Sequence, residues 1–213
     1  MKKQIQVLFL DDEENILRSL QRLFINEPYA IAKISGIKMC QYYYNQYNCN
    51  FLSIMPTNLY GPGDNFDLEQ SHVLPALIRK FHEAKLDNLE SVTLWGTGIA
   101  KREFLYVNDM AEASLFVLHN IDAKYIYNDG ISQINVGAGK DISIAELAKL
   151  VKKIVGYSGK ISYDKSKPDG MLVKLLNVDR LSNIGWSYKT SLTDGIKKTY
   201  DWFLKTETNN IRK

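Results

Sequence analysis

Hydrophobic and polar positions near the N-terminus predict a strand, an acidic turn and two helical segments. The apolar run Ile5–Leu10 is followed by the acidic segment 11–14. Apolar residues within Ile16–Phe24 then recur at the 3.6-residue period of a helix. The breaker Asn26–Pro28 predicts a boundary, after which a second helical pattern runs over Tyr29–Tyr47.

Short strand patterns and helical patterns alternate over the rest of the chain. A buried-type strand, Phe51–Met55, leads into the turn-rich loop Pro56–Gly63. Further predicted strands are Val92–Trp95, Glu103–Val107, Gln133–Val136 and Lys160–Tyr163. Further predicted helices are Val73–Ala84, Met110–His119 with Asp109 as its cap, Ile142–Val155 with Ser143 and Glu146 at capping-box spacing, and Leu192–Leu204. This alternation predicts an α/β protein with a mainly parallel sheet and a smaller α/β lobe.

Composition and charge narrow the classes of function. A chain of 213 residues with 45% hydrophobic and 24% charged residues is typical of a globular protein. The net charge of +3 gives no basis for a nucleic-acid partner. No stretch approaches the roughly 18 apolar residues of a membrane span, so we expect no membrane partner and a cytoplasmic location. Cys40 and Cys49 form no metal-binding spacing, and we expect no disulfide framework and no metal site.

Tyr29 and Lys33 are the first candidate for chemistry. They stand four residues apart and share one face if the segment is helical. A neighbouring ammonium stabilises a phenolate and lowers a tyrosine pKa from about 10 towards the range of a general acid or base. A half-buried surface pair is the alternative. Tyr163 and Lys167 have the same spacing, but Pro168 disfavours a helix there.

Several longer motifs, in order, show a family resemblance. They are Asn26–Lys38, Met55–Pro62, Asp64–Phe66, Ser71–Val73, Leu94–Gly96, Arg102–Phe104, Asn108–Asp109 and Lys167–Gly170. Together they resemble the GDP-L-fucose synthases, which are extended short-chain dehydrogenase/reductases. The resemblance covers about residues 26–213 and implies a Rossmann-like parallel sheet with a smaller substrate-binding lobe.

The resemblance also implies a reaction. It is the NADPH-dependent epimerisation and reduction of GDP-4-keto-6-deoxy-D-mannose to GDP-L-fucose. Tyr29 then protonates the developing alkoxide, Lys33 lowers the tyrosine pKa and holds the cofactor NADP(H), and His72 matches the acid of the epimerisation and also contacts the cofactor. An unperturbed histidine titrates near neutrality, which suits that task, although a solvated loop residue is the alternative.

Two further groups of residues match binding positions of the family. Pro56, Thr57, Asn58 and Leu59 match the loop that contacts the cofactor, and they follow a predicted strand, where ligands bind in open α/β sheets. Lys80, Trp95, Arg102 and Asp169 match the positions that hold the GDP-sugar. The alternatives are a plain turn for the first group and, for the second, Trp95 as a core residue, Arg102 as a solvated charge and Asp169 as a turn former.

The glycine-rich turn that cradles a dinucleotide pyrophosphate has no match in this sequence. The pairs in Gly61–Gly63, Gly96–Gly98 and Gly137–Gly139 each lack a third glycine. We therefore expect an incomplete Rossmann-like sheet, and we weigh a GDP-sugar-binding remnant without turnover, or another nucleotide-sugar epimerase or dehydratase, as alternatives. A homodimer is a further expectation from the resemblance.

Residues 1–25 resemble something different, the first strand and helix of a response-regulator receiver domain. Asp11 and Asp12 take the place of its acidic pair, which would suit Mg²⁺. The rest of a receiver is absent from the sequence, and solvated acids at a helix start are the alternative. The sequence thus divides into 1–25 and 26–213.

Overall fold

A computed structural model describes residues 14–68 and 70–210, and side chains within 30–68 and 70–206. The chain divides into two compact units. The first holds residues 14–53 and Ala123–Ser132, and the second holds Ile54–Asp122 with the chain from Gln133 onward. The predicted strand Ile5–Leu10, Asp11 and Asp12 lie outside the described residues, so the receiver-like segment stays a prediction.

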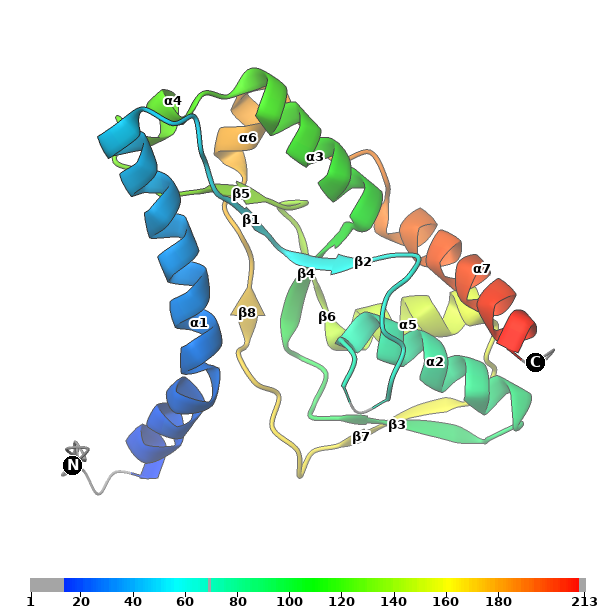
Figure 1. Cartoon of the computed structure of the whole chain (residues 1–213). Coiled ribbons are helices and arrows are strands. Elements are labelled where there is room, and N and C mark those ends of the chain that lie inside the picture. Colours follow the sequence, from blue (N-terminus) through cyan, green and yellow to red (C-terminus); the bar gives the residue numbers. More distant parts are fainter. Residues whose placement is uncertain (1–13, 69, 211–213) are drawn as a thin grey trace. The chain divides into compact units, whose positions relative to one another are not determined.

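The first unit is built on one long helix. Helix α1 runs without interruption over Glu14–Tyr47 (Figure 1), so the break predicted at Asn26–Pro28 is wrong. A proline inside a helix costs about 3 kcal/mol, and the good helix formers on both sides outweigh that cost here. At its end α1 packs on the short helix α4, Ala123–Tyr127, through the Tyr44 and Tyr127 rings, whose centroids are 5.2 Å apart. No helix within the described ranges is both long and apolar enough to cross a bilayer.

The second unit contains three groups of strands. Strand β1, Ile54–Pro56, pairs with β5, Ile134–Val136, and β3, Ser91–Trp95, pairs with β7, Lys160–Asp164. The third group is β2, Asn58–Tyr60, β4, Lys101–Tyr106, β6, Asp141–Ser143, and β8, Val173–Lys174. All pairings are parallel except β4 with β6. The predicted α/β class with mainly parallel strands is confirmed.

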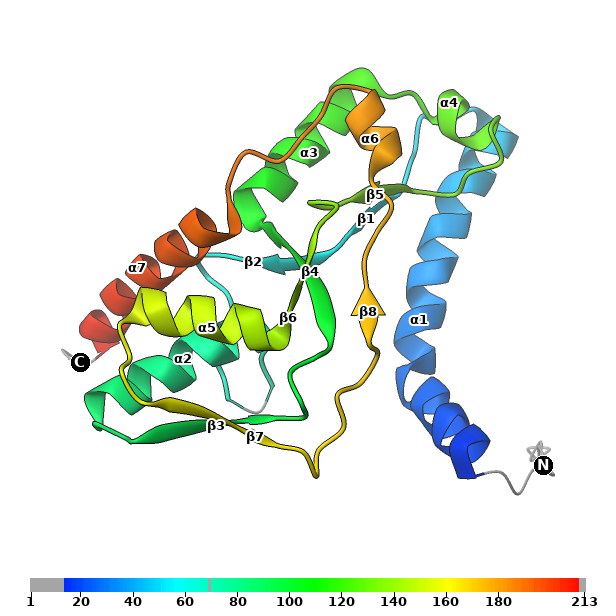
Figure 2. The same ribbon diagram turned by 180° about the vertical axis from the view of Figure 1, so that it is seen from behind.

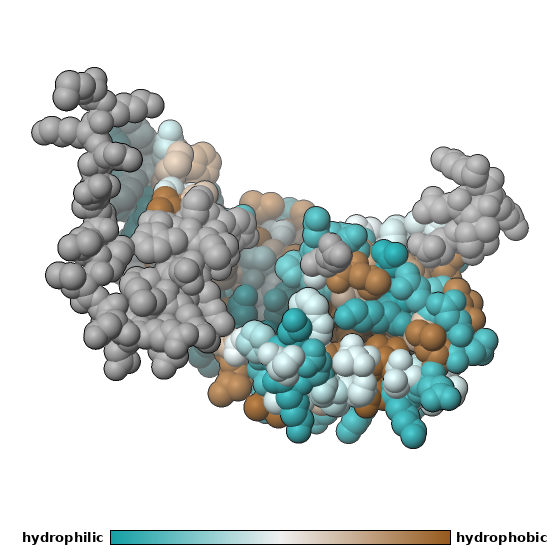
Figure 3. Space-filling view, turned by 90° about the horizontal axis from the view of Figure 1, so that it is seen from below, coloured by the Kyte–Doolittle hydropathy of each residue, from teal (hydrophilic) through white to brown (hydrophobic). Residues whose placement is uncertain are grey.

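Five helices complete this unit. They are α2, Val73–Leu86, α3, Val107–Asn120, α5, Ile144–Val155, α6, Asp179–Asn183, and α7, Leu192–Asn210. Helix α5 packs against both α2 and α7 (Figures 1 and 2). The core between them contains Ile78, Phe81, Leu147 and Ile196, all fully buried. The outer surface is mixed, with hydrophilic and hydrophobic residues interspersed on the face shown in Figure 3.

The helix starts show one correct and one wrong capping prediction. Ser143 caps α5 as expected, since its hydroxyl accepts from Glu146 N at 3.2 Å while the Glu146 carboxylate accepts from Ser143 N at 3.1 Å. Asp109 does not cap α3, because Tyr106 is the N-cap. Asp109 is buried and accepts instead from the backbone N–H and the hydroxyl of Thr190, 81 positions further along the chain.

Glu103, in the middle of β4, contacts three other segments of the second unit. Its side chain is 0% exposed, and its two carboxylate oxygens accept from Gly139 N at 2.7 Å and Leu176 N at 3.0 Å. Its backbone carbonyl accepts from the side chains of Thr57 at 3.3 Å and Asn58 at 2.7 Å. The strand therefore ties β2 to two loops that the sequence places far away.

Replacing Glu103 by glutamine tests this role. The amide nitrogen of Glu103→Gln would face one of the two backbone N–H donors, which then loses its partner in a buried place. We expect the free energy of unfolding to fall by about 1–3 kcal/mol. Urea denaturation measures it, and Glu90→Gln at an exposed position before β3 serves as the control, expected within about 0.5 kcal/mol of the parent. Equal effects of the two substitutions would contradict the assignment.

Candidate active site

Trp95 is the centre of a polar cluster at the carboxyl end of β3. The indole is 70% exposed, so the alternative of a core tryptophan is wrong. The Lys80 ammonium, from the middle of α2, lies 5.9 Å from the centroid of the ring. An exposed aromatic face beside a cation is a surface on which a planar, negatively charged ligand can bind.

The loop that follows β7 is fixed beside Trp95 by Asp169. One carboxylate oxygen accepts from Thr97 N at 2.6 Å and from Gly98 N at 3.3 Å, and the other accepts from the Thr97 hydroxyl at 2.7 Å. These hydrogen bonds hold the pKa of Asp169 below its usual 3.8. A Cβ at Gly96 would collide with this carboxylate, and Gly96 adopts a φ of 80°, so the turn needs glycine.

Arg102 lies on β4 at the far end of the same loop. One guanidinium nitrogen donates to the carbonyls of Lys101 at 2.7 Å and Met171 at 2.6 Å. A second nitrogen faces Gly170, where a Cβ would lie 3.6 Å away. The loop thus has Asp169 and the contact of the guanidinium at its two ends, and all four predicted residues, Lys80, Trp95, Arg102 and Asp169, lie in the second unit.

The predicted cofactor loop Pro56–Leu59 is held rigidly at the carboxyl end of β1. Thr57 N donates to Val136 O at 3.0 Å, and its hydroxyl and the Asn58 amide donate to the Glu103 carbonyl. Pro56 remains exposed, and Leu59 lies in β2. The segment is not a plain turn, because β2 begins at Asn58.

His72 occupies the N-cap position of α2. Its backbone is extended, its side chain is exposed, and that side chain makes no capping hydrogen bond. A histidine that is not used to hold the helix end is available to exchange protons with a ligand. Before the helix, the Asp67 carboxylate accepts from Gln70 N at 2.8 Å, and the Asp67 backbone carbonyl accepts from Ser71 N at 3.1 Å.

Tyr29 and Lys33 belong to the first unit. Both lie in α1, so their spacing of four places them on one face of that helix, as predicted. Lys33 is exposed. The structure therefore meets the helical condition on which the acid–base interpretation of the pair depends.

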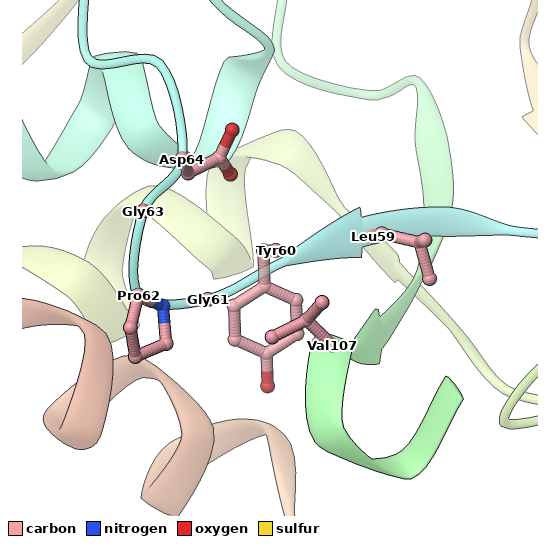
Figure 4. A pocket seen from close by; sticks show the side chains of 7 residues that line it. All are labelled: Leu59, Tyr60, Gly61, Pro62, Gly63, Asp64 and Val107. Carbon is pink, nitrogen blue, oxygen red and sulfur yellow. The ribbon is translucent and has the colours of Figure 1, made fainter. Parts of the chain in front are cut away.

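A small pocket at the end of β2 is lined mainly by residues of the predicted loop Pro56–Gly63. Tyr60, Val107 and the loop Gly61–Asp64 line it (Figure 4). Tyr60 donates to Leu192 O at 3.5 Å, and burial raises the pKa of its phenol well above its usual value, so it stays protonated. The Asp64 carboxylate points to the other side of the loop, and burial raises its pKa as well. The motifs Met55–Pro62 and Asp64–Phe66 mark this stretch in the sequence, but no local signal indicates that Val107 joins it.

Parallel strand pairs covered by helices, with cations and an exposed aromatic at the strand ends, place this chain in the Rossmann-like class of α/β proteins. The model of the NAD dependent epimerase/dehydratase family matches residues 12–137, and the chain belongs to that family.

Relatives found by sequence and by structure carry the name GDP-L-fucose synthase or synthetase. The chain is 51% identical over 184 residues to GDP-L-fucose synthase 1 of Arabidopsis thaliana, covering 86% of this chain and 55% of that protein. It is equally similar to GDP-L-fucose synthase of Escherichia coli strain K12, with 85% and 57% covered. A crystal structure of a GDP-L-fucose synthetase from Naegleria fowleri bound to NADP superposes with a TM-score of 0.77 at 29% identity, covering 84% and 54%. The chain spans little more than half the length of these relatives.

The Asp169 anchor predicts a pH dependence of the loop. Because the folded pKa is lowered, the stabilisation is complete above the usual carboxyl pKa of 3.8 and is lost as the pH falls through the lowered value. Asp169→Asn removes the charge at neutral pH. We expect roughly fivefold faster hydrogen–deuterium exchange at Gly96–Gly98 in this variant, measured by mass spectrometry. Asp201→Asn on the exposed face of α7 should leave the exchange unchanged. Equal protection in all three proteins would show that Asp169 does not hold the turn.

Proposed function

We propose that this chain acts in the NADP(H)-dependent epimerisation and reduction of GDP-4-keto-6-deoxy-D-mannose to GDP-L-fucose. The observation that carries the proposal is the cluster around Trp95, where an exposed aromatic, the Lys80 ammonium and an anchored loop meet at the carboxyl ends of β3 and β7, and the far end of that loop contacts the Arg102 guanidinium. The relatives named GDP-L-fucose synthases support the choice of substrate.

Each residue of the cluster has a physical task in holding a GDP-sugar. The Trp95 face stacks on the base, and the Lys80 ammonium and the Arg102 guanidinium neutralise the diphosphate. Asp169 keeps the turn and the loop in place, because both of its oxygens already accept hydrogen bonds from the protein. The family resemblance also implies that Asp169 accepts hydrogen bonds from donors of the ribose or base. Lone pairs not used by Thr97 and Gly98 remain for such bonds.

The cofactor site is assigned to Pro56, Thr57, Asn58 and Leu59, with Lys33 and His72. The residues present fit the nicotinamide end of NADP(H), since Thr57 and Asn58 are locked to Glu103 while Pro56 stays exposed at a strand end. When bound, NADPH supplies the hydride that reduces the keto carbon of the sugar. The residues named above hold the nicotinamide ring in place and orient it.

Tyr29, Lys33 and His72 move the protons. Tyr29 gives its phenolic proton to the oxygen that becomes the hydroxyl of the product, and the Lys33 ammonium stabilises the resulting phenolate. His72, by the family resemblance, is the acid of the epimerisation, which gives its proton to the sugar carbon; the base that first takes the proton from that carbon is not among these three residues. The exposed position of His72 at the start of α2 gives it access to a ligand.

A second candidate is a GDP-sugar-binding protein without turnover. The distribution of residues favours it, because Lys80, Trp95, Arg102 and Asp169 all lie in the second unit, whereas Tyr29 and Lys33 lie in the first. GDP binding by this candidate needs only one unit. Another nucleotide-sugar epimerase or dehydratase is the nearest enzymatic alternative, and a preference for UDP over GDP would favour it.

Calorimetric titration of the full chain separates these candidates. We expect saturable binding of GDP, weaker binding of UDP, and saturable binding of NADPH that falls at least about tenfold in a Tyr29→Phe, Lys33→Ala variant. The matched control is Lys38→Ala, Tyr42→Phe, a pair with the same spacing on the same helix. GDP binding without NADPH binding would favour the protein without turnover, and absence of both would overturn the proposal.

From the family resemblance we also propose that the protein is cytoplasmic and forms a homodimer. Both cysteines are free thiols in the structure, which fits the reducing cytoplasm. For a homodimer, the support is the apolar surface of α1, where Ile31 is 53% and Ile34 is 58% exposed. Two copies of such a helix can bury these side chains against each other.

Sedimentation equilibrium tests the dimer. We expect twice the mass of the chain for the parent protein and the monomer mass for Ile31→Lys, Ile34→Lys, because charges at the centre of the interface remain unpaired. Leu118→Lys, at a residue 73% exposed on α3, is the control and should not change the mass. A parent protein that sediments as a monomer would rule out the dimer.

A further inference from the structure

The loop between β7 and β8 holds Lys167 in a defined position. On one side, an Asp164 carboxylate oxygen accepts from Ser166 N at 3.0 Å and from the Ser166 hydroxyl at 2.6 Å, and Lys167 N donates to Asp164 O at 3.2 Å. On the other side, Asp169 fixes the loop to Thr97. With anchors on both sides, the backbone of Lys167 has little freedom, which lowers the entropic cost of using its side chain.

From this position the Lys167 side chain reaches the indole that Lys80 also contacts. The Lys167 ammonium lies 5.7 Å from the centroid of the Trp95 ring, and the Lys80 ammonium lies 5.9 Å from it. The two lysines come from different elements, the loop after β7 and helix α2. Two ammonium groups beside one exposed ring repel each other, and an anion bound there removes the repulsion.

The geometry points to Lys167 as a further binding residue for a nucleoside diphosphate, contacting the phosphates together with Lys80 while the base stacks on Trp95. This inference rests on the proposed function and adds a residue to its site. A nucleoside diphosphate fits because it joins a planar base, suited to the indole, to the negative charges that the ammonium groups need. The same groups make the affinity depend on salt, since the contacts lie at the surface.

The same loop provides a matched control. Lys165 is an exposed lysine two residues before Lys167, so Lys165→Gln removes the same charge from the same loop. Lys167→Arg keeps the charge and changes only the shape of the side chain. Circular dichroism and thermal unfolding establish that every variant of the full chain is folded.

Titration calorimetry with GDP and guanosine tests the role of Lys167. We expect Lys167→Gln to weaken GDP binding about fivefold at low salt, the size expected for one exposed charge contact. Guanosine binding should stay within about twofold because it carries no phosphate. Lys167→Arg and Lys165→Gln should bind GDP within about twofold of the parent, and the loss in Lys167→Gln should shrink in 0.5 M salt, roughly three times the physiological ionic strength.

Each other outcome has a definite meaning. Unchanged GDP binding by Lys167→Gln, in a parent protein that binds GDP, would overturn the role of Lys167 and leave the proposed function standing. An equal loss of guanosine and GDP binding would overturn it too, because Lys167 would then act only by placing Trp95. A folded parent protein that binds no GDP would overturn both.

Discussion

The buried carboxylate of Glu103 is the interaction on which the second unit depends. A charge without a partner inside a protein costs several kcal/mol, so the chain around it must supply donors. Backbone N–H groups of Gly139 and Leu176 do so, and Gly137 leaves space for the carboxylate where a Cβ would collide with it. The same residue accepts from Thr57 and Asn58 through its carbonyl. One residue of β4 therefore holds the segment Thr57–Asn58 and two loops together.

The proposed nucleotide site is also held in place by carboxylates that accept hydrogen bonds. Asp164 and Asp169 fold one loop through hydrogen bonds to nearby backbone and hydroxyl groups, and these bonds lower the pKa of both carboxyls. Because β3 and β7 are parallel, their carboxyl ends meet, and Trp95 and this loop become neighbours although they lie about seventy residues apart. The cations are supplied separately, by α2 and β4. The proposed ligand site thus depends on strand pairing, which brings Trp95 beside this loop.

In the second unit, the hydrophobic patterns predicted the longer helices and strands well and missed short strands. Helices α2 and α5 and strands β3, β5 and β7 follow their hydrophobic patterns closely, because each buries one face in the core. The short strands β2, β6 and β8 were missed, since two or three residues carry no period. The continuous α1 was missed because Pro28 is a strong breaker in isolation and the surrounding helix outweighs it.

The sequence by itself determined the family, the α/β class and the candidate residues Tyr29, Lys33 and His72, because motif order and hydrophobic period are properties of the chain. Only the tertiary structure decided what Glu103, Asp109 and Asp169 do. In the sequence, Asp109 is predicted as a cap, Asp169 has a turn former as its alternative, and Glu103 only begins a predicted strand. Each accepts hydrogen bonds from residues 36 to 81 positions away. Partners at that distance are chosen by strand pairing and burial, which no local pattern encodes.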